Sequence, residues 1–168
     1  AIYGSFYNAK QNPENDSMKL EWMSYLVGKR ESRRLKGDYI YTFNDMKKNT
    51  RFNDAVAKGT RDVDVHYQRF LKDPSIVDFL SEALFYPVEE YYIPYRSLYS
   101  SNIENLFMAG RCFSCSHIGL GGPRVMNTTG QMGIAVGYAA SLCKKYETSP
   151  RGVYEEHIDE LTGIIKNQ

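Results

Sequence analysis

Residues 105–125 read NLFMAGRCFSCSHIGLGGPRV, in which a short apolar run ends at Gly-Arg and gives way to a loop of cysteine, serine, histidine and glycine. The run from Asn105 to Ala109 is typical of a strand that is buried on both faces. The small residues that follow, 124–146, predict the longest helix of the chain. A strand, a glycine loop and a helix in this order can direct backbone N–H groups and the positive end of a helix dipole toward an anion or an electron-rich ring edge.

Glycines give this loop its conformational freedom. Gly110 would let a ligand approach the end of the strand closely, and Gly119, Gly121 and Gly122 would permit unusual backbone angles. Pro123 would fix the direction in which the chain enters the helix. Glycine-rich loops of this kind also occur in proteins that bind nothing there, so ligand binding and simple packing both stay open.

The predicted helix has one face that is almost bare backbone. Gly130, Gly133, Gly137 and Ser141 lie three or four residues apart, which places them on one side. Each interior glycine costs about 1 kcal/mol relative to alanine, so the stripe needs a compensating contact. We expect this face to pack closely against another element, and only the first turn, residues 124–128, to touch a ligand.

The first hundred residues carry mostly the alternating pattern of antiparallel strands. Residues 2–7 and 18–27 are predicted to pair across a turn-rich segment, and residues 54–66 are predicted to return to strand. Pro94 has no amide hydrogen to donate to a strand ladder. Residues 91–100 are therefore predicted to form an edge strand or a connecting segment.

Further helices are predicted from capping residues and helical spacing. Thr42 and Asp45 form a capping box for a short helix. Asp73 and Pro74 suit the cap and first turn of another helix, with apolar residues following at helical spacing: Ile76, Phe79, Leu80, Ala83 and Leu84. Residues 151–165 carry a single apolar stripe, which predicts a second C-terminal helix.

The order of these elements predicts an α+β fold in two regions. Residues 1–100 form an antiparallel region, and residues 101–168 contribute a strand, a glycine loop and two helices. The chain is 42% hydrophobic and 24% charged, as in a soluble globular protein. No apolar run approaches the roughly 20 residues that span a bilayer.

Charge and cysteine content narrow the possible partners and compartments. Twenty-one Lys and Arg residues against 20 Asp and Glu leave a formal charge of +1, so no global field would recruit nucleic acid or an anionic membrane. Three cysteines are an odd number, which favours a reducing, cytoplasmic compartment over a disulfide framework. The first ten residues lack a signal-peptide pattern and an initiator methionine, so an upstream segment could precede them, and the compartment stays open.

Several polar residues are candidates for a site. His117 lies in the loop, where a neutral imidazole could act as an acid or a base. His66 ends an alternating strand, and Arg96 lies between two tyrosines after Pro94. Each could equally belong to an ordinary polar surface.

Two cysteines of the loop, Cys112 and Cys115, form a C-x-x-C pair. Such a pair could relay electrons as a dithiol, or it could fill space as two small residues. A structural zinc would need two further ligands at familiar spacing, which Cys143 and His117 do not provide, so no metal is expected.

The loop and the segments around it resemble a known family. The stretch NLFMAGRCFSCSHIGLGGPRVMNTTGQMGIAVGYAA, together with GKRESRRLKGDYI, RFNDAVAKG, YIPYRSLYSSNIENL and SPRGVYEEHIDEL, is similar to the C-terminal part of the FAD-dependent oxidoreductase family. The match runs in order over nearly the whole chain. It implies a substrate-side antiparallel region, followed by a strand and a helix that complete an FAD-binding domain.

The resemblance also implies cofactor contacts. In the family, the AGR segment passes the ribityl and pyrophosphate of FAD, and the helix start after GPRV points at the pyrimidine edge of the flavin. A helix N-terminus there would stabilise the negative charge that accumulates on reduction. The residues implied as FAD contacts are Gly110, Arg111, Cys112, Gly122, Arg124, Val125 and Met126.

The family's equivalent of KRESRR approaches the cofactor. If this segment does so too, Arg33 shares a face with Leu35 and turns inward, where its guanidinium could clamp a carboxylate or a carbonyl. The other interpretation is a solvated charged strand. The resemblance thus implies hydride transfer from a small organic or carbohydrate-type substrate, with His117 and either Arg33 or Arg96 orienting it.

One departure from the family is large. The sequence contains no G-x-G-x-x-G and opens with no βαβ unit, so the site for the adenosine diphosphate half of FAD is missing. We therefore expect a fragment or one half of a split enzyme, which associates with an N-terminal half or with further copies of itself. Two alternatives are a non-catalytic interaction module that does not bind FAD alone, and a carbohydrate-active protein, since some relatives are labelled xanthan-lyase-related.

Overall fold

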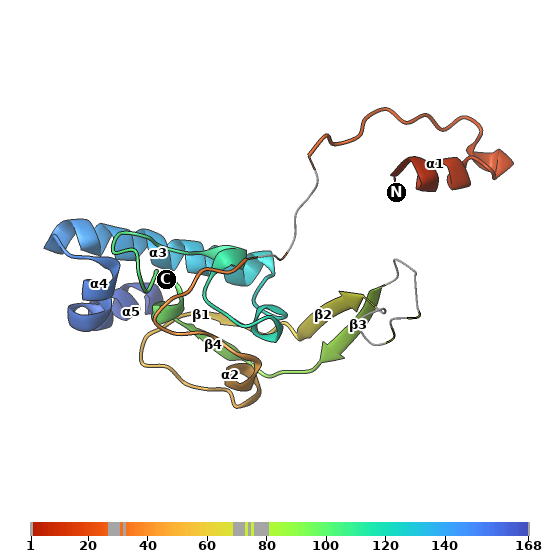
Figure 1. The fold of residues 1–168 in the computed structure, drawn as a ribbon. Coiled ribbons are helices and arrows are strands. Elements are labelled where there is room, and N and C mark those ends of the chain that lie inside the picture. Colours follow the sequence, from red (N-terminus) through yellow and green to blue (C-terminus); the bar gives the residue numbers. More distant parts are fainter. Residues whose placement is uncertain are drawn as a thin grey trace. The chain divides into compact units, whose positions relative to one another are not determined.

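The computed structural model (Figure 1) describes residues 2–26, 31, 33–68, 73, 75 and 81–167. The chain divides into two units, Ala1–Ser32 and Arg33–Gln168. Helices and small antiparallel sheets are both present, which confirms the α+β class. No helix within these described ranges is long and apolar enough to cross a membrane.

The first unit is helical where strands were predicted. Helix α1 spans Ile2–Ala9 and buries none of its residues. Residues 18–26 form no strand, so the predicted pair of residues 2–7 with residues 18–27 is wrong as far as the structure describes it. A helix satisfies its backbone hydrogen bonds internally, whereas a strand needs a partner, and residues 18–26 do not supply one.

The sheet of β1 and β4 is the buried one. Strand β1 (Ala55–Gly59) pairs antiparallel with β4 (Tyr91–Pro94), with an irregularity between Ala55 and Ala57. Most residues of both strands are buried. Strand β4 ends at Pro94 in a sheet of two strands, which confirms the edge strand predicted from the missing amide hydrogen.

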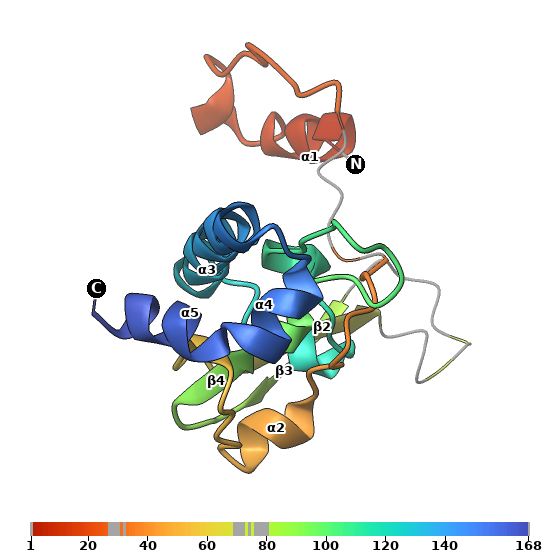
Figure 2. The same ribbon diagram turned by 90° about the vertical axis from the view of Figure 1, so that its left-hand side faces the viewer.

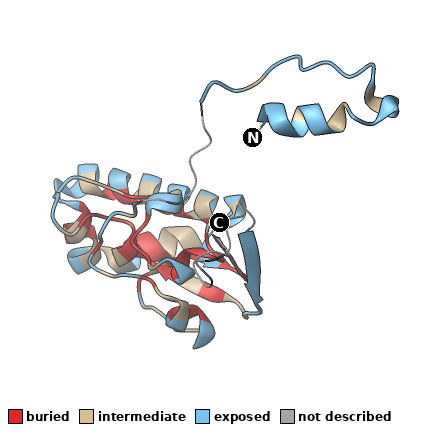
Figure 3. Ribbon diagram, turned by 45° about the vertical axis from the view of Figure 1, so that its right-hand side comes forward, coloured by how far each residue is buried: buried red, intermediate tan, exposed pale blue. Residues whose placement is uncertain are grey.

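The second sheet is a hairpin of β2 (Val63–Gln68) and β3 (Ser81–Tyr86), with His66 opposite Ala83. The strand prediction for residues 54–66 is thus confirmed as two strands. Strand β3 is exposed along its whole length (Figure 3).

The predicted helix after Asp73 is wrong at its end, because Ala83 and Leu84 lie in β3. Pairing with β2 prevailed over helical spacing, since leucine, phenylalanine and tyrosine also suit a strand. The other apolar residues of that prediction lie outside the described residues: Ile76, Phe79 and Leu80. Ser75 does form a local turn, because its N–H donates to the Asp73 carboxylate at 3.0 Å.

Helix α2 (Phe43–Lys47) begins where the capping box predicted it. The N–H and the hydroxyl of Thr42 both donate to the Asp45 carboxylate, at 2.8 and 2.7 Å. The Tyr39 hydroxyl donates to the other carboxylate oxygen at 2.7 Å. Asp45 therefore joins the helix start to the extended segment before it.

The C-terminal part consists of helices α3 (Met126–Tyr146), α4 (Pro150–Glu156) and α5 (Ile158–Lys166). Figure 2 shows α4 and α5 beside α3. The longest helix is confirmed, whereas the single helix predicted over residues 151–165 is interrupted at His157. The ring of His157 stacks on Tyr146 with centroids 3.8 Å apart, and the backbone there leaves the helical region at φ −132°.

The apolar run before the loop is not a regular strand. Phe107 forms a single antiparallel bridge with Tyr99, and the Met108 N–H donates to the Leu98 carbonyl at 2.8 Å. Met108 is buried, as the prediction required. The rest of the run is exposed at Asn105 and only partly buried at Phe107, and it makes one bridge instead of a strand, so the prediction of a strand buried on both faces is wrong.

The core lies between α3 and the β1–β4 sheet and is rich in tyrosine. Its largest buried rings are Tyr41, Tyr91, Tyr95, Tyr99 and Phe113. The Tyr95 hydroxyl donates to the Pro150 carbonyl at 2.8 Å, which joins the core to the start of α4. Burial raises the pKa of Tyr95 well above its usual range, so this donor stays neutral.

Candidate functional site

The start of α3 lies between two turns that come from different parts of the chain. The short 3₁₀ turn Gly110–Cys112 contacts one side, and a Cβ placed on Gly110 would lie 4.0 Å from the Cβ of Thr129. Gly110 has φ +80°, a backbone angle that favours glycine. The AGR segment and the first turns of α3 are therefore neighbours.

Helix α3 offers unsatisfied backbone donors at its start. Its N-cap residue, Val125, makes no side-chain capping bond to the amides of the first turn. A helix of 21 residues also carries a full dipole, with the positive end at this point. The arrangement suits a negatively charged or electron-rich group.

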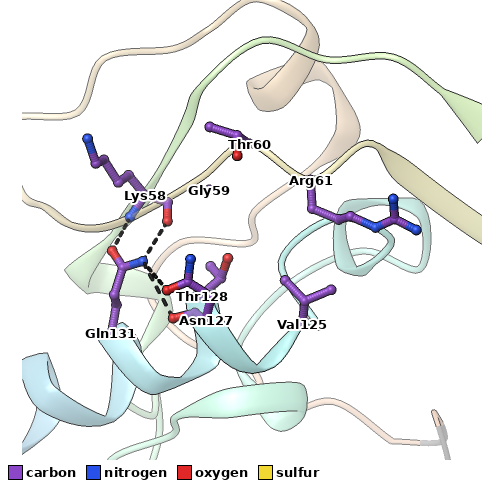
Figure 4. Close-up of a pocket in the computed structure, with 8 residues that line it drawn as sticks. All are labelled: Lys58, Gly59, Thr60, Arg61, Val125, Asn127, Thr128 and Gln131. Atoms are coloured by element: carbon purple, nitrogen blue, oxygen red, sulfur yellow. Dashed lines mark hydrogen bonds between the residues drawn. The ribbon is translucent and has the colours of Figure 1, made fainter.

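A small pocket of about 130 Å³ lies where this helix start meets the turn between β1 and β2 (Figure 4). Gln131 joins the two elements: its Oε1 accepts from the Lys58 N–H, and its Nε2 donates to the Lys58 carbonyl, both at 3.0 Å. The pocket is lined by Lys58, Gly59, Thr60, Arg61, Val125, Asn127, Thr128 and Gln131.

The hydroxyl of Tyr91 lies against Gly59, which is one of the residues that line this pocket. A Cβ on Gly59 would come within 2.6 Å of that hydroxyl, and one on Gly122 within 2.8 Å, so both positions need glycine to admit the tyrosine. Burial raises the pKa of Tyr91 to about 12, although the Thr128 side chain and the Arg61 backbone act against the shift. Gly122 is thus placed to make room for Tyr91.

Asp64 joins two residues that the sequence singled out separately. Arg124 donates from Nη2 to the Asp64 carbonyl at 3.0 Å and to Oδ2 at 2.9 Å. Nε2 of His66 lies 2.8 Å from Oδ1 of the same carboxylate. Arg61 completes the cluster with an ion pair of 3.6 Å to Oδ2. Arg124 and His66 are therefore both held beside the start of α3.

Sequence reasoning missed Asp64, although a signal was present. In the alternating strand Val63-Asp64-Val65-His66, residues two apart share a face. An acid and a histidine at that spacing place a carboxylate next to an imidazole. Weighing His66 by itself left the carboxylate out.

Arg96 is held by a buried carboxylate. Its Nε and Nη2 lie 2.9 and 3.1 Å from the oxygens of Asp54, which is completely buried. The hydrogen bond that Arg96 donates to Asp54 raises the pKa of Arg96. The guanidinium also lies 5.4 Å from the Tyr39 ring and 5.0 Å from the Tyr154 ring. This arrangement fixes the segment after β4, and substrate binding by Arg96 stays a prediction.

Of the two interpretations of Arg33, the structure agrees with the solvated one, and a role of Arg33 at a substrate stays a prediction. Arg33 is exposed, and Leu35 on the same face is exposed too. The neighbouring Arg34 donates instead from Nε to the Cys115 carbonyl at 2.8 Å. The opposite parity of the extended segment therefore faces the loop, because an extended chain turns successive side chains to opposite sides.

The remaining predicted residues are mostly exposed. His117 precedes the 3₁₀ turn Ile118–Leu120, and both Arg111 and Cys112 face solvent. Cys112 donates from Sγ to the Ala109 carbonyl at 3.3 Å. Among the residues that the structure describes, no group of histidine, cysteine and acidic side chains could hold a metal ion.

The glycine face of α3 does not pack as predicted. A Cβ at Gly130, Gly133 or Gly137 would meet no atom within 4 Å. On the same side, Met126 is 89% exposed and Ile134 is 52% exposed. The neighbouring elements contact the other side of the helix, where the residues with small and apolar side chains are buried: Met132, Ala135, Ala139 and Leu142.

Comparison with known proteins identifies the family of this chain. A model of the family described as "FAD dependent oxidoreductase" matches residues 4–164. Because the match covers nearly the whole chain, this protein belongs to the FAD-dependent oxidoreductase family. No curated protein and no solved structure matched the chain.

The residues present fit one end of FAD. The uncapped start of α3, the left-handed backbone of Gly110 and the open side of Met126 suit the flavin end of the cofactor. The sequence has no G-x-G-x-x-G to hold the adenosine diphosphate end.

Proposed function

We propose that this chain is the C-terminal, flavin-side portion of an FAD-dependent oxidoreductase that oxidises a small organic or carbohydrate-type substrate by hydride transfer. The observation that carries the proposal is the uncapped N-terminus of α3 beside Gly110, with its φ of +80°. When bound, FAD supplies the hydride acceptor.

The start of α3 has a chemical role in this proposal. Its N–H groups and dipole would stabilise negative charge on a flavin held beside it, which would favour the reduced cofactor. Arg111, Cys112 and Met126 flank this position and are exposed, so a cofactor can reach them. Arg124 acts through Asp64, which holds it against strand β2.

A proton must leave the substrate as it is oxidised, and two histidines are candidates to accept it. His66 is held at Nε2 by Asp64, which leaves Nδ1 as the other nitrogen of the ring. His117 lies in the exposed loop next to the AGR segment. Replacing each histidine by asparagine in the FAD-loaded protein shows which of the two is the base. Loss of the base should lower kcat about 100-fold or more, whereas the other replacement should not.

We further propose that an N-terminal half covers the glycine face of α3. The exposed Met126 and Ile134, with the open space beside Gly130, Gly133 and Gly137, support this assignment. Small residues on a helix let another element approach its backbone closely. Such a partner would also supply the missing site for the adenosine diphosphate of FAD.

The test is to express the chain joined to its upstream sequence and to measure bound flavin by absorbance. We expect a yellow protein, and we expect Gly110→Val to lose flavin because valine is strained at φ +80°. Lys144→Gln, at the far end of α3, is the matched control and should retain flavin. A folded, colourless product that added FAD does not restore would overturn the proposal.

A second candidate function is a non-catalytic interaction module. The absence of a dinucleotide fingerprint from the sequence and the exposed apolar side of α3 favour it. Calorimetry with FAD, together with sedimentation of the chain, separates the two functions. The module would self-associate or bind a protein partner, and it would give no heat with FAD even when joined to the upstream sequence.

A further inference from the structure

The hairpin of β2 and β3 (Figure 1) has one open strand edge. Strand β3 pairs with β2 on one side, and within the described part of the chain no strand lies on its other side. All of its residues are exposed, and three consecutive ones are large and apolar: Leu84, Phe85 and Tyr86. A hairpin of two strands is only marginally stable in water, and an exposed apolar edge is a template for a further strand. We propose that β3 pairs antiparallel with β3 of a second copy of this chain.

The backbone of Asp64 shows which groups of β3 point to the open edge. Asp64 lies opposite Phe85 in the hairpin. Its N–H donates to the Gly121 carbonyl at 3.3 Å, and its own carbonyl accepts from Arg124 at 3.0 Å. Because both groups point away from β3, Asp64 and Phe85 form a non-hydrogen-bonded pair of the ladder. The N–H and C=O of Phe85, and those of Ala83 on the same parity, are therefore directed to the open edge.

These groups limit the register of the proposed pair. Directly opposite residues of an antiparallel ladder are either both hydrogen-bonded or both not, so the two-fold axis passes through a residue and not between two. An axis at Leu84 places Ala83 of each copy opposite Phe85 of the other, and each such pair exchanges both of its N–H···O=C hydrogen bonds. An axis at Phe85 would place Ala83 opposite Pro87, which has no N–H to donate.

Charge complementarity favours Leu84 over Ala83 as the axis. The ammonium group of the exposed Lys47 lies 5.9 Å from the centre of the Tyr86 ring. With the axis at Leu84, Glu82 of one copy lies opposite Tyr86 of the other, so its carboxylate comes close to that ammonium group. The two-fold axis repeats this pair of opposite charges at both ends of the interface. With the axis at Ala83, Glu82 would instead lie opposite an apolar side chain.

The same register covers the apolar side chains of β3. Leu84 is 53% exposed, and the two copies of Leu84 face each other at the axis. They form a non-hydrogen-bonded pair, in which side chains approach each other closely. On the opposite face of the strand, Phe85, which is 62% exposed, lies beside the small Ala83 of the other copy. A second copy therefore matches this edge in backbone groups, in charge and in side-chain size.

The pairing is complete with two copies. Each copy has a single β3 with one open edge, and the pairing uses both edges. The outer strands of the combined sheet are the two copies of β2, whose far side is already bonded at Asp64 to Gly121 and Arg124. The contact is the same on both copies, so it yields a closed dimer and not a fibre. This dimer does not depend on FAD or on the proposed function.

The first experiment is sedimentation of the chain without FAD over a range of concentrations. We expect a concentration-dependent dimer and no larger species. Lys47→Glu and Glu82→Lys should each weaken dimerisation about tenfold, because each places like charges together at both ends of the interface. The double variant restores opposite charges and should regain most of the affinity. Lys47→Glu changes no residue of β3, so it keeps the test readable if Glu82→Lys disrupts the hairpin.

A cross-link tests the register. Leu84→Cys is made together with Cys112→Ser, which removes the exposed thiol. Mild oxidation should join two copies at position 84, because the Cα atoms of a non-hydrogen-bonded pair lie about 4.5 Å apart, within the range of a disulfide. Glu82→Cys in the same background is the control. The two copies of position 82 would be about 13 Å apart along the strands, so this variant should stay unlinked.

Ile134→Lys, on the exposed glycine face of α3, is the control for association through another surface and should leave the dimer unchanged. A monomer at every concentration, a dimer that only Ile134→Lys weakens, or equal cross-linking at positions 82 and 84 would each overturn the inference. A monomer after the chain is joined to its upstream sequence would also overturn it, because the upstream half would then cover β3. A failure of the proposed function would appear separately, as a colourless full-length protein.

Discussion

The two faces of α3 differ in what their small residues accomplish. On one face Met132, Ala135 and Ala139 are completely buried against the rest of the unit. On the other face Gly133 and Gly137 have open space where a side chain would be. Alanine and glycine both permit close approach, yet only the alanines are in contact here. The comparison shows that only the buried face attaches α3 to the rest of the unit. The glycines of the other face make the helix itself less stable.

Met132→Ala should have the largest effect, because it empties a site with no exposed surface. Truncating a buried methionine costs about 2–5 kcal/mol of unfolding free energy. Ile134→Ala, on the glycine face and 52% exposed, should cost less than about 0.5 kcal/mol. Urea denaturation of both variants measures the difference, and equal losses would remove the distinction between the faces.

Gln131→Leu should come next, because it keeps the size of the side chain but breaks both hydrogen bonds to the Lys58 backbone. The expected loss of unfolding free energy is about 1–2 kcal/mol, because Gln131 lies at the border of the packed face. The lower stability should appear as a reduced denaturation midpoint. Ser141→Ala, on the glycine face, is the control, and an equal change there would contradict the role given to Gln131.

Gly133→Ala should change the stability in the opposite direction. The new methyl group meets no atom within 4 Å, and alanine favours a helix by about 0.5–1 kcal/mol over glycine. We expect a higher melting temperature for the chain alone. In the protein joined to its upstream sequence, the same change should instead weaken assembly, and a gain in both contexts would show that nothing covers this face.

The smallest effect concerns Asp38 and Arg151, which join α4 to the extended segment before Tyr39. Arg151 donates to both oxygens of Asp38, at 2.7 and 2.8 Å, and this hydrogen bonding lowers the pKa of Asp38. A lowered folded pKa stabilises the protein above the unfolded value of about 4, and that stability is lost as pH falls through the folded pKa.

Unfolding midpoints at pH 6 and pH 3 measure this loss. Asp38→Asn should be slightly less stable than the parent at pH 6, and the difference should be smaller at pH 3. The difference is small because both side chains are partly exposed. A difference in stability of the same size at pH 3 as at pH 6 would show that packing, and not the charge of Asp38, is responsible.

Local signals were enough to predict part of this fold. The capping box at Thr42 and Asp45 lies within four residues, and Pro94 limits its own strand by lacking a donor. The long helix after the loop follows from residues that are adjacent in the sequence. Each of these features is determined by residues close together in the sequence, so it does not depend on distant contacts.

The failures needed information about distant partners. Residues 2–7 look like a strand until the absence of a pairing segment is known, and Ala83 and Leu84 look helical until β2 is seen beside them. The site shows the same division. His66 and Arg124 were identified, but their connection through Asp64 spans sixty residues and appears only in the fold.

Gln131 also affects whether strand β1 can pair with a strand from another molecule of this chain. Strand β1 has β4 on one side, and on the other side the amide and carbonyl of Lys58 would be open to a strand from another molecule. The glutamine side chain has the same amide chemistry as a peptide group and occupies both positions. The side chain of Gln131 therefore blocks the addition of a strand from another molecule at Lys58. Blocking an open strand edge in this way opposes aggregation without a third strand.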